Sequence, residues 1–497
     1  MFVTASSLEE GRHLRHDVVV VGAGAAGITL AAELVAAGVD VGLVEGGGRT
    51  PTERSQARYQ GPLTVGEGLE YPPLDAYRLR YFGGTTNHWG GWCRPLDASV
   101  MEPRPGVSDG WPFPRSELDQ WYEIAHQWCE IGRMEYRISE LGGPGQHLGR
   151  QLGRQLGDDL DVHVLRFSRP TRFGEAYGSI FDGPGSTVYL EANCTAIAMD
   201  GPAATHVVVQ DEQGVSHEIA ADRVVVACGG IETSRQLLLC AASGASMLDR
   251  SATLAAGFHE HPHVHAGTLF VDPDWLTTKA AEAVVGAAFD IDMTPYRATF
   301  ALPADDSDGL LSGSVMLSLS GGADGVAVDG RHSTAVAALA ELATSRSPAA
   351  LDVFVRTEQR LEPSSRVVLG SEVDDTGVPR AGLDWRISPP DVDDIRRVRD
   401  RVLTRLMGVR ALGAVGALEE PTGPTRLVTG GAHHMGGARI HESPDHGVVD
   451  ADLRCHGTSN LHVCGSAVFP SSGWSNPTLT IVALAARLAH HLAGGTR

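Results

Sequence analysis

Residues 16–45 read HDVVVVGAGAAGITLAAELVAAGVDVGLVE, and this stretch decides the fold of the first part of the chain. A β-branched run precedes the glycines and an alanine-rich amphipathic segment follows them, which predicts strand, tight turn, helix and second strand. Gly22 permits the turn, Gly24 lets the backbone approach a pyrophosphate, and Gly27 lets the helix pack on the strand. Glu45 can accept both ribose hydroxyls. The stretch therefore predicts an α/β unit that binds an ADP-containing dinucleotide, either FAD or NAD.

The composition is that of a folded globular protein. The chain has 497 residues, 42% of them hydrophobic, and is long enough for two or more cores. Sixty-one acidic against 40 basic residues give a formal charge of −21, which argues against nucleic acid or an anionic membrane surface as partner. The seven cysteines form no C-x-x-C pair, so neither a disulfide framework nor a zinc site is indicated. With no apolar signal core and no long apolar run, the expected location is cytoplasmic, without membrane contact.

The end of the chain contains a second strand-loop-helix pattern. Residues 460–490 read NLHVCGSAVFPSSGWSNPTLTIVALAARLAH, which predicts a short buried strand over 461–463, a glycine-led loop, and a helix that starts near Pro477. Proline suits a first helical position because its missing N–H would have no intrahelical acceptor there. The helix N-terminus directs free N–H groups and partial positive charge at whatever lies beyond Asn476. An anion or an electron-rich ring would be stabilised at that point.

A loop rich in glycines, small hydroxyls and aromatic rings lies between these two stretches. Residues 78–95 read RLRYFGGTTNHWGGWCRP, a composition that lets a flat ligand lie against the backbone under aromatic cover. Together the three stretches resemble the glucose–methanol–choline (GMC) family of FAD-dependent oxidoreductases, closest to its pyranose-oxidase and gluconate-dehydrogenase-like branch. The resemblance implies an α/β fold, α+β overall, with a Rossmann-like FAD-binding domain assembled from discontinuous segments. It also implies a substrate domain with a mainly antiparallel sheet flanked by helices.

The resemblance also suggests where these domains lie. We expect the FAD-binding domain over residues 1–105, 187–265 and 440–497, and the substrate domain over 106–186 and 266–439, with a helix over 333–345. In the branch named above, G-G-x-[ST]-x-H-W runs along the flavin. In pyranose oxidases its histidine is joined to the 8α-methyl group. This chain has Asn87 where those enzymes carry threonine, so two alternatives stay open: His88 forms that bond, or it packs beside the ring.

The segment TGGAHHMGGAR, residues 429–439, resembles the family motif H-x-x-G-T-x-R. By that spacing His433 faces the flavin as the catalytic histidine, and Gly437 departs from the usual threonine. Asn476 matches the second catalytic position. The chemistry suits this pair, because hydride leaves an alkoxide far more readily than a neutral alcohol. A histidine with a pKa near neutrality can accept the hydroxyl proton, and an amide N–H can hold the resulting oxyanion.

Four histidines alternate along residues 258–265, FHEHPHVH. On a strand this spacing places His259, His261, His263 and His265 on one face, and a metal site is one interpretation. Steps of ~6.6 Å spread ligands instead of converging them on a tetrahedron, so we expect no metal.

The leading hypothesis is FAD-dependent oxidation of an alcohol to a carbonyl, on a sugar, glycoside or cyclitol hydroxyl. The alternatives are a flavin-containing lyase or isomerase that uses His433 as acid and base, a tailoring oxidase of a natural-product alcohol, and an NAD-binding dehydrogenase. The electron acceptor, oxygen or a quinone or redox protein, stays open, as does the oligomeric state. The predicted catalytic residues are His433 and Asn476. The predicted cofactor-binding residues are Gly22, Gly24, Gly27, Glu45, Gly83, Gly84, Thr85, Thr86, Asn87, His88, Trp89, Cys194, Ala227, Gly465, Ser466, Ala467, Pro477 and Thr478.

Overall fold

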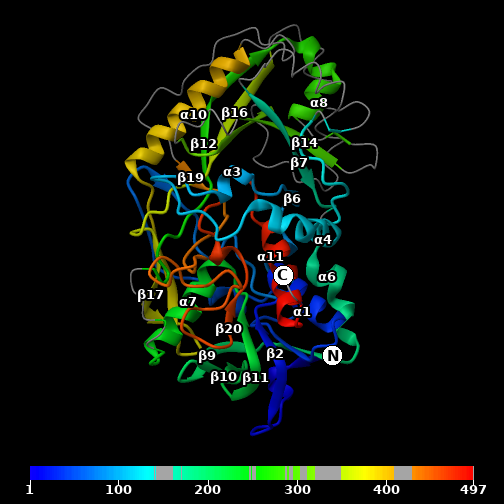
Figure 1. Ribbon diagram of the computed structural model, residues 1–497, viewed down its shortest axis with the longest axis vertical. Helices are drawn as coiled ribbons and strands as arrows, with labels where there is room; N and C mark the ends of the chain where they lie inside the picture. The colour runs from blue at the N-terminus through cyan, green and yellow to red at the C-terminus, as the bar shows by residue number, and fades with distance from the viewer. Residues whose placement is uncertain are drawn as a thin grey trace.

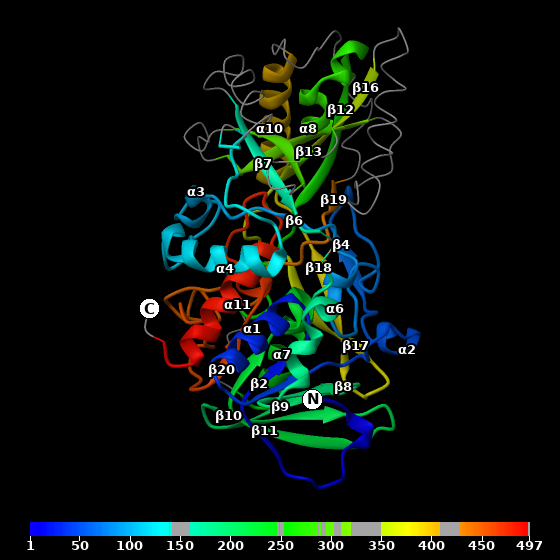
Figure 2. The ribbon, with the colours of Figure 1, turned by 90° about the vertical axis from the view of Figure 1, so that its right-hand side faces the viewer.

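Two large β-sheets occupy opposite ends of an elongated molecule (Figure 1), and a view turned by 90° shows the same separation (Figure 2). The computed structural model describes residues 1–138, 140–141, 160–169, 171–245, 248, 253–285, 288–289, 295–302, 310–319, 349–407 and 428–495. The helix expected over 333–345 lies outside these residues.

The lower sheet in Figure 1 is built around the β-branched run quoted above. Val18, Val19 and Val20 in β2 are completely buried, as expected for a strand covered on both faces. The sheet runs in the order β1-β8-β3-β2-β11-β10-β9, and β20 also pairs with β11. Strands β1, β8, β3, β2, β11 and β20 pair in parallel, and β10 pairs antiparallel with both of its neighbours. The strands are β1 Phe2–Thr4, β2 Leu14–Val21, β3 Val41–Val44, β8 Ser186–Leu190, β9 Asn193–Asp200, β10 Ala203–Gln210, β11 Ser216–Val226 and β20 Leu461–Val463.

Helices from both ends of the chain meet on this sheet. Helix α1 (Ala25–Ala36) packs directly against α11 (Thr478–Leu492), and the two lie together in the middle of Figure 1. The strand predicted over 461–463 is confirmed, because β20 continues the parallel edge beside β11. The helix predicted to start near Pro477 begins one residue later, and Pro477 is its N-cap. With φ −74° and ψ −19°, proline still suits this entry.

The upper sheet is mainly antiparallel, in the order β5-β19-β12-β16-β15-β14-β7-β6, with β13 beside β14. Helices α8 (Lys279–Val285) and α10 (Pro389–Met407) lie beside it in both ribbon views. The predicted fold class, a Rossmann-like α/β unit plus an antiparallel sheet flanked by helices, is therefore confirmed. The strands are β5 Leu69–Glu70, β6 Trp92–Cys93, β7 Asp161–Phe167, β12 Pro262–Val271, β13 Ala288–Phe289, β14 Pro295–Ala301, β15 Gly313–Leu319, β16 Ala349–Thr357 and β19 Val428–Gly430.

The proposed domain boundaries stay a prediction. Strands β5 and β6 fall inside the range 1–105, yet both pair with strands of the upper sheet. A small third sheet joins β17 (Arg366–Val373), β18 (Pro379–Trp385) and β4 (Leu63–Val65). The remaining helices of three residues or more are η1 Ala5–Ser7, α2 Glu53–Ala57, η2 Gly84–Asn87, α3 Ala98–Met101, η3 Arg115–Leu118, α4 Asp119–Cys129, α6 Phe173–Tyr177, η4 Gly178–Asp182, α7 Gly229–Ala242, η5 Pro273–Thr277 and η8 Ser466–Val468.

The expectation that four alternating histidines share one strand face is wrong. Strand β12 begins at Pro262, so His259 and His261 precede it, and only His263 and His265 belong to the strand. His259 forms an isolated bridge to Met435 instead. The apparent period of two is broken because the chain enters the strand at a proline.

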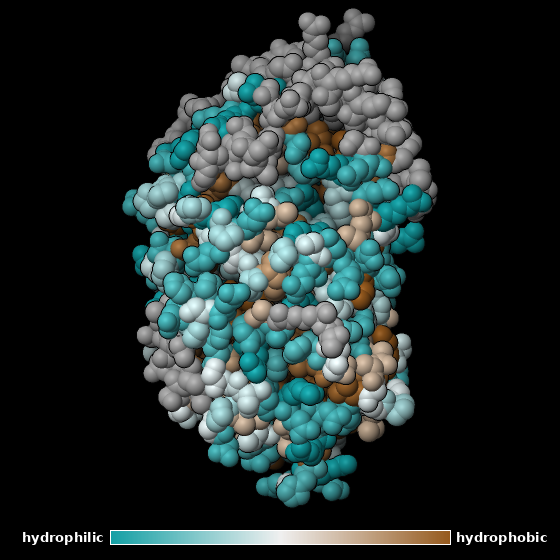
Figure 3. All heavy atoms as spheres, in the orientation of Figure 1, coloured by the Kyte–Doolittle hydropathy of each residue, from teal (hydrophilic) through white to brown (hydrophobic). Residues whose placement is uncertain are grey.

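The surface in the orientation of Figure 3 is mostly hydrophilic, and hydrophobic residues appear there in small separate groups. Along the described segments, no helix combines the length and the apolar character needed to cross a bilayer.

The close packing of α1 on β2 depends on Gly27. A Cβ at this position would lie 1.8 Å from the carbonyl oxygen of Gly22. Relieving that clash would require the backbone of the turn or the helix to move, which costs free energy. We expect Gly27→Ala to destabilise the protein by roughly 2 kcal/mol or more, seen as a lower thermal midpoint. Gly183→Ala is the matched control, because its Cβ would meet no atom within 4 Å and its φ is −80°. An equally stable Gly27→Ala variant would contradict this packing.

Candidate active site

A cavity of about 1140 Å³ lies between the two large sheets. Its volume exceeds the range of roughly 300–1,000 Å³ usual for a single small ligand, so it has room for a dinucleotide and a substrate. Its walls come from both ends of the chain and from the upper sheet. The sequence-predicted residues that line it are Gly22, Gly24, Glu45, Gly84, Thr85, Thr86, His88, Trp89, Cys194, Ala227, His433, Gly465, Ser466, Asn476, Pro477 and Thr478.

Four predicted cofactor-binding residues stand behind this wall: Gly27, Gly83, Asn87 and Ala467. Gly27 allows the helix packing described above. The Asn87 amide donates to the Phe82 carbonyl oxygen at 2.9 Å, and Ala467 is completely buried while its carbonyl accepts from the Ala438 N–H at 2.9 Å. These residues shape the loops that carry the wall.

The glycine turn after β2 fits a pyrophosphate. Gly22 has φ 105°, and a Cβ there would lie 2.7 Å from the Ala227 carbonyl oxygen. A Cβ on Gly24 would meet nothing within 4 Å, so the backbone at this position is open to the cavity. Helix α1 starts directly behind it with no side-chain cap, which leaves N–H groups of its first turn for an anion.

Glu45 is held at the end of β3 by backbone donors. Its two carboxylate oxygens accept from the Ala23 N–H at 3.1 Å and the Gly47 N–H at 2.8 Å, and the side chain is 6% exposed. Burial raises the pKa of Glu45, while these hydrogen bonds and the charge of Arg80 lower it. Each oxygen keeps a free lone pair, so the carboxylate can still accept from hydroxyl groups in the cavity.

The loop 83–89 is folded tightly against the first glycine turn. Gly83 has φ 98° and its N–H donates to the Ala23 carbonyl oxygen at 2.9 Å. The Thr86 hydroxyl donates back to the Gly83 carbonyl at 2.6 Å. His88 is exposed toward the cavity, with Nε2 3.3 Å from the Tyr77 carbonyl oxygen. The loop therefore leaves the imidazole accessible to a ligand.

The two predicted catalytic side chains are in contact. Asn476 Nδ2 lies 2.9 Å from His433 Nε2, and Arg356 Nη1 donates to Asn476 Oδ1 at 2.9 Å. Because a guanidinium has only donors, the amide oxygen must face Arg356, and the amide N–H must therefore face His433. In this arrangement His433 Nε2 is an acceptor.

The other side of His433 fixes its tautomer. His433 Nδ1 lies 2.7 Å from Nδ1 of His261. A neutral imidazole carries one proton, and Nε2 already accepts, so the proton is on Nδ1 and is donated to His261. Burial, followed by the charge of Arg356, holds the pKa of His433 well below its ordinary value. The site thus presents a neutral imidazole whose basic nitrogen faces Asn476.

Glu260 fixes the backbone beneath this pair. Its carboxylate accepts from the N–H of His433 at 2.8 Å, the N–H of His261 at 3.2 Å and the Tyr71 hydroxyl at 2.6 Å. The side chain is completely buried, and burial raises its pKa to about 7 despite these hydrogen bonds. Glu260 therefore ties the segments that carry His261 and His433 into one unit.

Sequence reasoning missed Glu260, His261 and the upper wall of the cavity. Alternation along β16 could have placed Phe354 and Arg356 on one face, but it could not show which face meets the cavity. The residues of this upper wall are Val285, Arg297, Met316, Ser318, Phe354, Arg356, His263 and His265.

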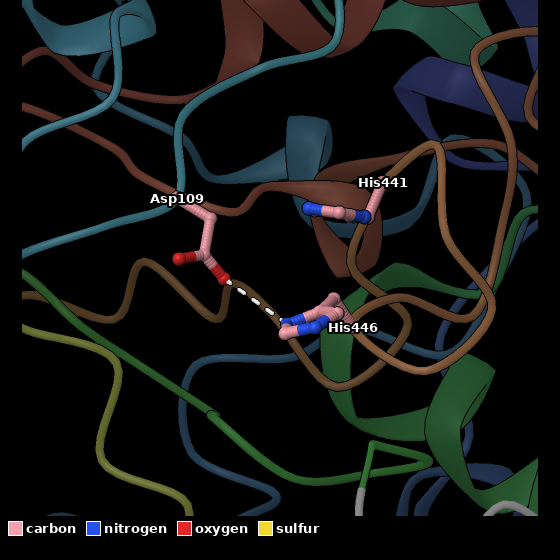
Figure 4. Close-up of side chains that lie close together, drawn as sticks. All are labelled: Asp109, His441 and His446. Carbon is pink, nitrogen blue, oxygen red and sulfur yellow. Dashed lines mark ion pairs between the residues drawn. The ribbon is translucent and has the colours of Figure 1, made fainter.

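One group of potential metal ligands occurs within the described parts of the chain. Asp109, His441 and His446 place ligand atoms within 4.8 Å of one another, and Figure 4 shows the three side chains around one surface loop. His446 Nδ1 lies 3.8 Å from Asp109 Oδ2, and His441 Nδ1 accepts from the Ser443 N–H at 2.9 Å. Asp109 and His446 are exposed, and none of the three lines the cavity. That the reaction needs no metal stays a prediction.

Comparisons with known proteins agree with this geometry. The model of the family described as FAD dependent oxidoreductase matches residues 17–416, and that described as GMC oxidoreductase matches residues 362–485. The large subunit of fructose dehydrogenase from Gluconobacter japonicus is 24% identical, over 96% of this chain and 97% of the relative. The 6'''-hydroxyparomomycin C oxidase of Streptomyces lividus is 26% identical, over 96% and 92%.

A solved structure shows the same fold. Pyridoxine 4-oxidase from Mesorbium loti superimposes with a TM-score of 0.61 and 16% identity, over 97% of this chain and 100% of that chain. The residues that line the cavity and the two family matches lead to one assignment. The chain belongs to the FAD-dependent oxidoreductases of the GMC family, with FAD as its cofactor.

Proposed function

We propose that this enzyme oxidises a hydroxyl group of a sugar, glycoside or cyclitol to a carbonyl, with His433 as base and Asn476 as partner of the alkoxide. The observation that carries the proposal is the 2.9 Å contact between Asn476 Nδ2 and His433 Nε2. His261 and Arg356 fix the orientation of these two side chains. His433 Nε2 is then an acceptor and the Asn476 N–H a donor at the point where a hydroxyl would bind.

The reaction uses this pair directly. FAD bound in the cavity supplies a hydride acceptor at its N5. A substrate hydroxyl that replaces the direct contact between the two side chains donates its proton to His433 Nε2 and accepts from the Asn476 amide. Proton transfer to a positioned histidine contributes typically about 10²–10⁴-fold. A preorganised amide donor stabilises the alkoxide and aligns the carbinol C–H, without reorganisation at the moment of reaction.

Surrounding residues hold this pair ready. Arg356 prevents the Asn476 amide from flipping, because rotation would place two donors face to face. His261 accepts the Nδ1 proton of His433 and so keeps Nε2 free as the base. When His433 becomes an imidazolium, His261 can still accept from Nδ1.

The residues for FAD follow from the cavity wall. Gly22, Gly24 and the start of α1 would hold the pyrophosphate, and Glu45 would accept the ribose hydroxyls. The loop from Gly84 to Trp89 would lie along the flavin ring, and Cys194 and Ala227 would lie near the nucleotide. Gly465 and Ser466 would contact the diphosphate–ribityl part, and the uncapped start of α11 at Pro477 and Thr478 would face the ring edge.

The substrate class is supported by two relatives of nearly full coverage. One is named for fructose and the other for a hydroxyparomomycin, both compounds that carry hydroxyl groups. One is a dehydrogenase and the other an oxidase, so the electron acceptor is decided by assay with oxygen and with quinones. The deciding experiment is an anaerobic screen of sugars, glycosides, cyclitols and simple alcohols for bleaching of the flavin band near 450 nm. A holoenzyme that no alcohol bleaches would overturn the proposal, and turnover without bleaching would assign a lyase or isomerase.

Removal of the base tests its role. We expect His433→Ala to keep its FAD and to lose flavin reduction by about 10²–10⁴-fold, because the imidazole that accepts the hydroxyl proton is removed. Stopped-flow bleaching under anaerobic conditions gives the rate. His206→Ala on β10 is the matched control, since this histidine lies outside the cavity wall. Normal reduction by His433→Ala would assign the base elsewhere.

The depressed pKa of His433 predicts the pH profile. A base must be unprotonated, and a pKa well below 6.5 keeps His433 neutral throughout the neutral range. We therefore expect protonation of His433 to lower kcat/KM for an uncharged substrate only below pH 6.5, and a smaller change near pH 7 would report Glu260, whose pKa is about 7. An acid limb centred above pH 7 would show that the base titrates in its ordinary range or higher.

The two alternatives for His88 are separated by denaturation. The imidazole is exposed at the cavity wall, which leaves it free to bond to the 8α-methyl group of the flavin. If the bond forms, the yellow colour stays with acid-precipitated protein and is released from His88→Ala. Colour in the supernatant of the wild-type protein would mean that His88 packs beside the ring.

A further inference from the structure

Arg356 is a buried cation at the substrate side of the cavity. It lies near the end of β16, is 1% exposed and uses Nη1 to hold Asn476. Its other two nitrogens, Nε and Nη2, are buried and have no hydrogen-bond partner among the described residues. These two atoms form the edge of a guanidinium that binds carboxylate or phosphate through two parallel N–H groups. This edge therefore has the two parallel donors that a carboxylate or phosphate needs.

Several other buried arginines among the described residues have acidic partners. Arg104 pairs with Glu358, Arg235 lies 2.7 Å from Asp374, and Arg58 lies 2.6 Å from both Glu212 and Asp375. Within the described segments, no carboxylate lies at ion-pair distance from Arg356. Burial and the charges of Arg94 and Arg297 lower its pKa to about 9, with no acid acting in the opposite direction. The rings of Trp92 and Trp474 lie 6.0 and 5.8 Å from the Cζ of Arg356 and compensate the buried charge only in part. An anionic partner that enters the cavity would compensate it further.

Arg297 on β14 adds a second positive charge to the same wall. It is 4% exposed and donates to the carbonyl oxygens of Val284 and Leu317, which do not neutralise it. Burial lowers its pKa to about 10. Arg94 nearby is already paired with Asp97. The upper wall thus carries the positive charges of two arginines, Arg297 and Arg356.

The acidic residues that line the cavity, Glu45 and Glu232, do not pair with Arg356 and have other partners. Glu232 pairs with Arg78 at 2.9 Å and with Arg235 at 3.3 Å, and Glu45 is bound to backbone N–H groups. Both belong to the wall formed by the lower sheet and α7, away from Arg356. Glu260 lies beneath His433 and accepts from Tyr71 and two backbone amides. None of these carboxylates neutralises the upper wall.

Building on the proposed function, we propose that the substrate is an anionic alcohol, a hydroxyl compound with a carboxylate or phosphate group whose charge Arg356 neutralises. Asn476 connects the two events, because one face of its amide meets Arg356 and the other meets the reacting hydroxyl. A carboxylate within a few bonds of the carbinol carbon would lie near the guanidinium. Uronates, aldonates, hydroxy acids and sugar phosphates have this combination, and amino sugars have the opposite charge.

A charge series on one sugar ring tests this. The wild-type holoenzyme is reduced anaerobically at pH 7 with glucuronate, glucose and glucosamine, which differ in charge on the same ring. Galacturonate is compared with galactose, gluconate with sorbitol, and glucose 6-phosphate with glucose. We expect kcat/KM for flavin bleaching to rank anion above neutral sugar above amine. In Arg356→Gln the ratio of anion to neutral sugar should fall by roughly 10- to 100-fold, the range for charge-assisted hydrogen bonds. Arg356→Lys should restore part of it, and Arg386→Gln, a surface arginine paired with Asp384, should leave the ratio unchanged.

A binding experiment distinguishes a failure of this inference from a failure of the proposed function. Cyclohexanecarboxylate and its uncharged amide are titrated into the oxidised enzyme, with the flavin spectrum as readout. Tighter binding of the carboxylate, lost in Arg356→Gln, supports the anion site even if no alcohol bleaches the flavin, in which case only the proposed oxidation fails. Equal or better binding and reduction by neutral compounds would overturn the inference. So would an Arg356→Gln variant that slows all substrates equally, because Arg356 would then act only by holding Asn476.

Discussion

The hydrogen bond between Asn476 and His433 is the contact on which the active site depends. It forms only if the amide oxygen is held away from the imidazole, and Arg356 does this from the upper sheet. It also requires the proton of His433 to be on Nδ1, and His261 accepts it there. Arg356 and His261, which are far apart in the sequence, therefore fix one donor and one acceptor. The cost of burying these polar groups is offset because each is bonded to the next.

The architecture explains why this contact lies where FAD binds. The lower sheet brings the first glycine turn and the last helix together, because α1 packs against α11 and β20 pairs with β11. The upper sheet closes the cavity with β12, β14, β15 and β16. In the proposed function, backbone-rich loops that permit close approach would hold the cofactor, and the substrate would face long polar side chains on rigid strands. Such strands set side-chain positions more sharply than loops do.

Charge is distributed unevenly in this cavity. The protein carries a formal charge of −21, yet the wall above His433 has two buried arginines and, along the described segments, no acid within ion-pair distance of Arg356. Low polarity around these groups strengthens their effect on any charge that develops nearby. Burial, followed by the charge of Arg356, lowers the pKa of His433, so the residue that orients the amide also contributes to keeping the imidazole neutral.

The sequence by itself determined the dinucleotide-binding unit, the fold class, and the two residues that meet at the centre of the site. Local patterns suffice for these, because the turn at Gly22 and the uncapped start of α11 follow from neighbouring residues and backbone geometry. Only the tertiary structure decided that Arg356, His261 and Glu260 complete the site, and that the four histidines do not share one strand face. His261 and His433 are 172 residues apart, and Arg356 and Asn476 are 120 apart. Which side chains meet across such separations is set by how the sheets pack, and no local spacing encodes it.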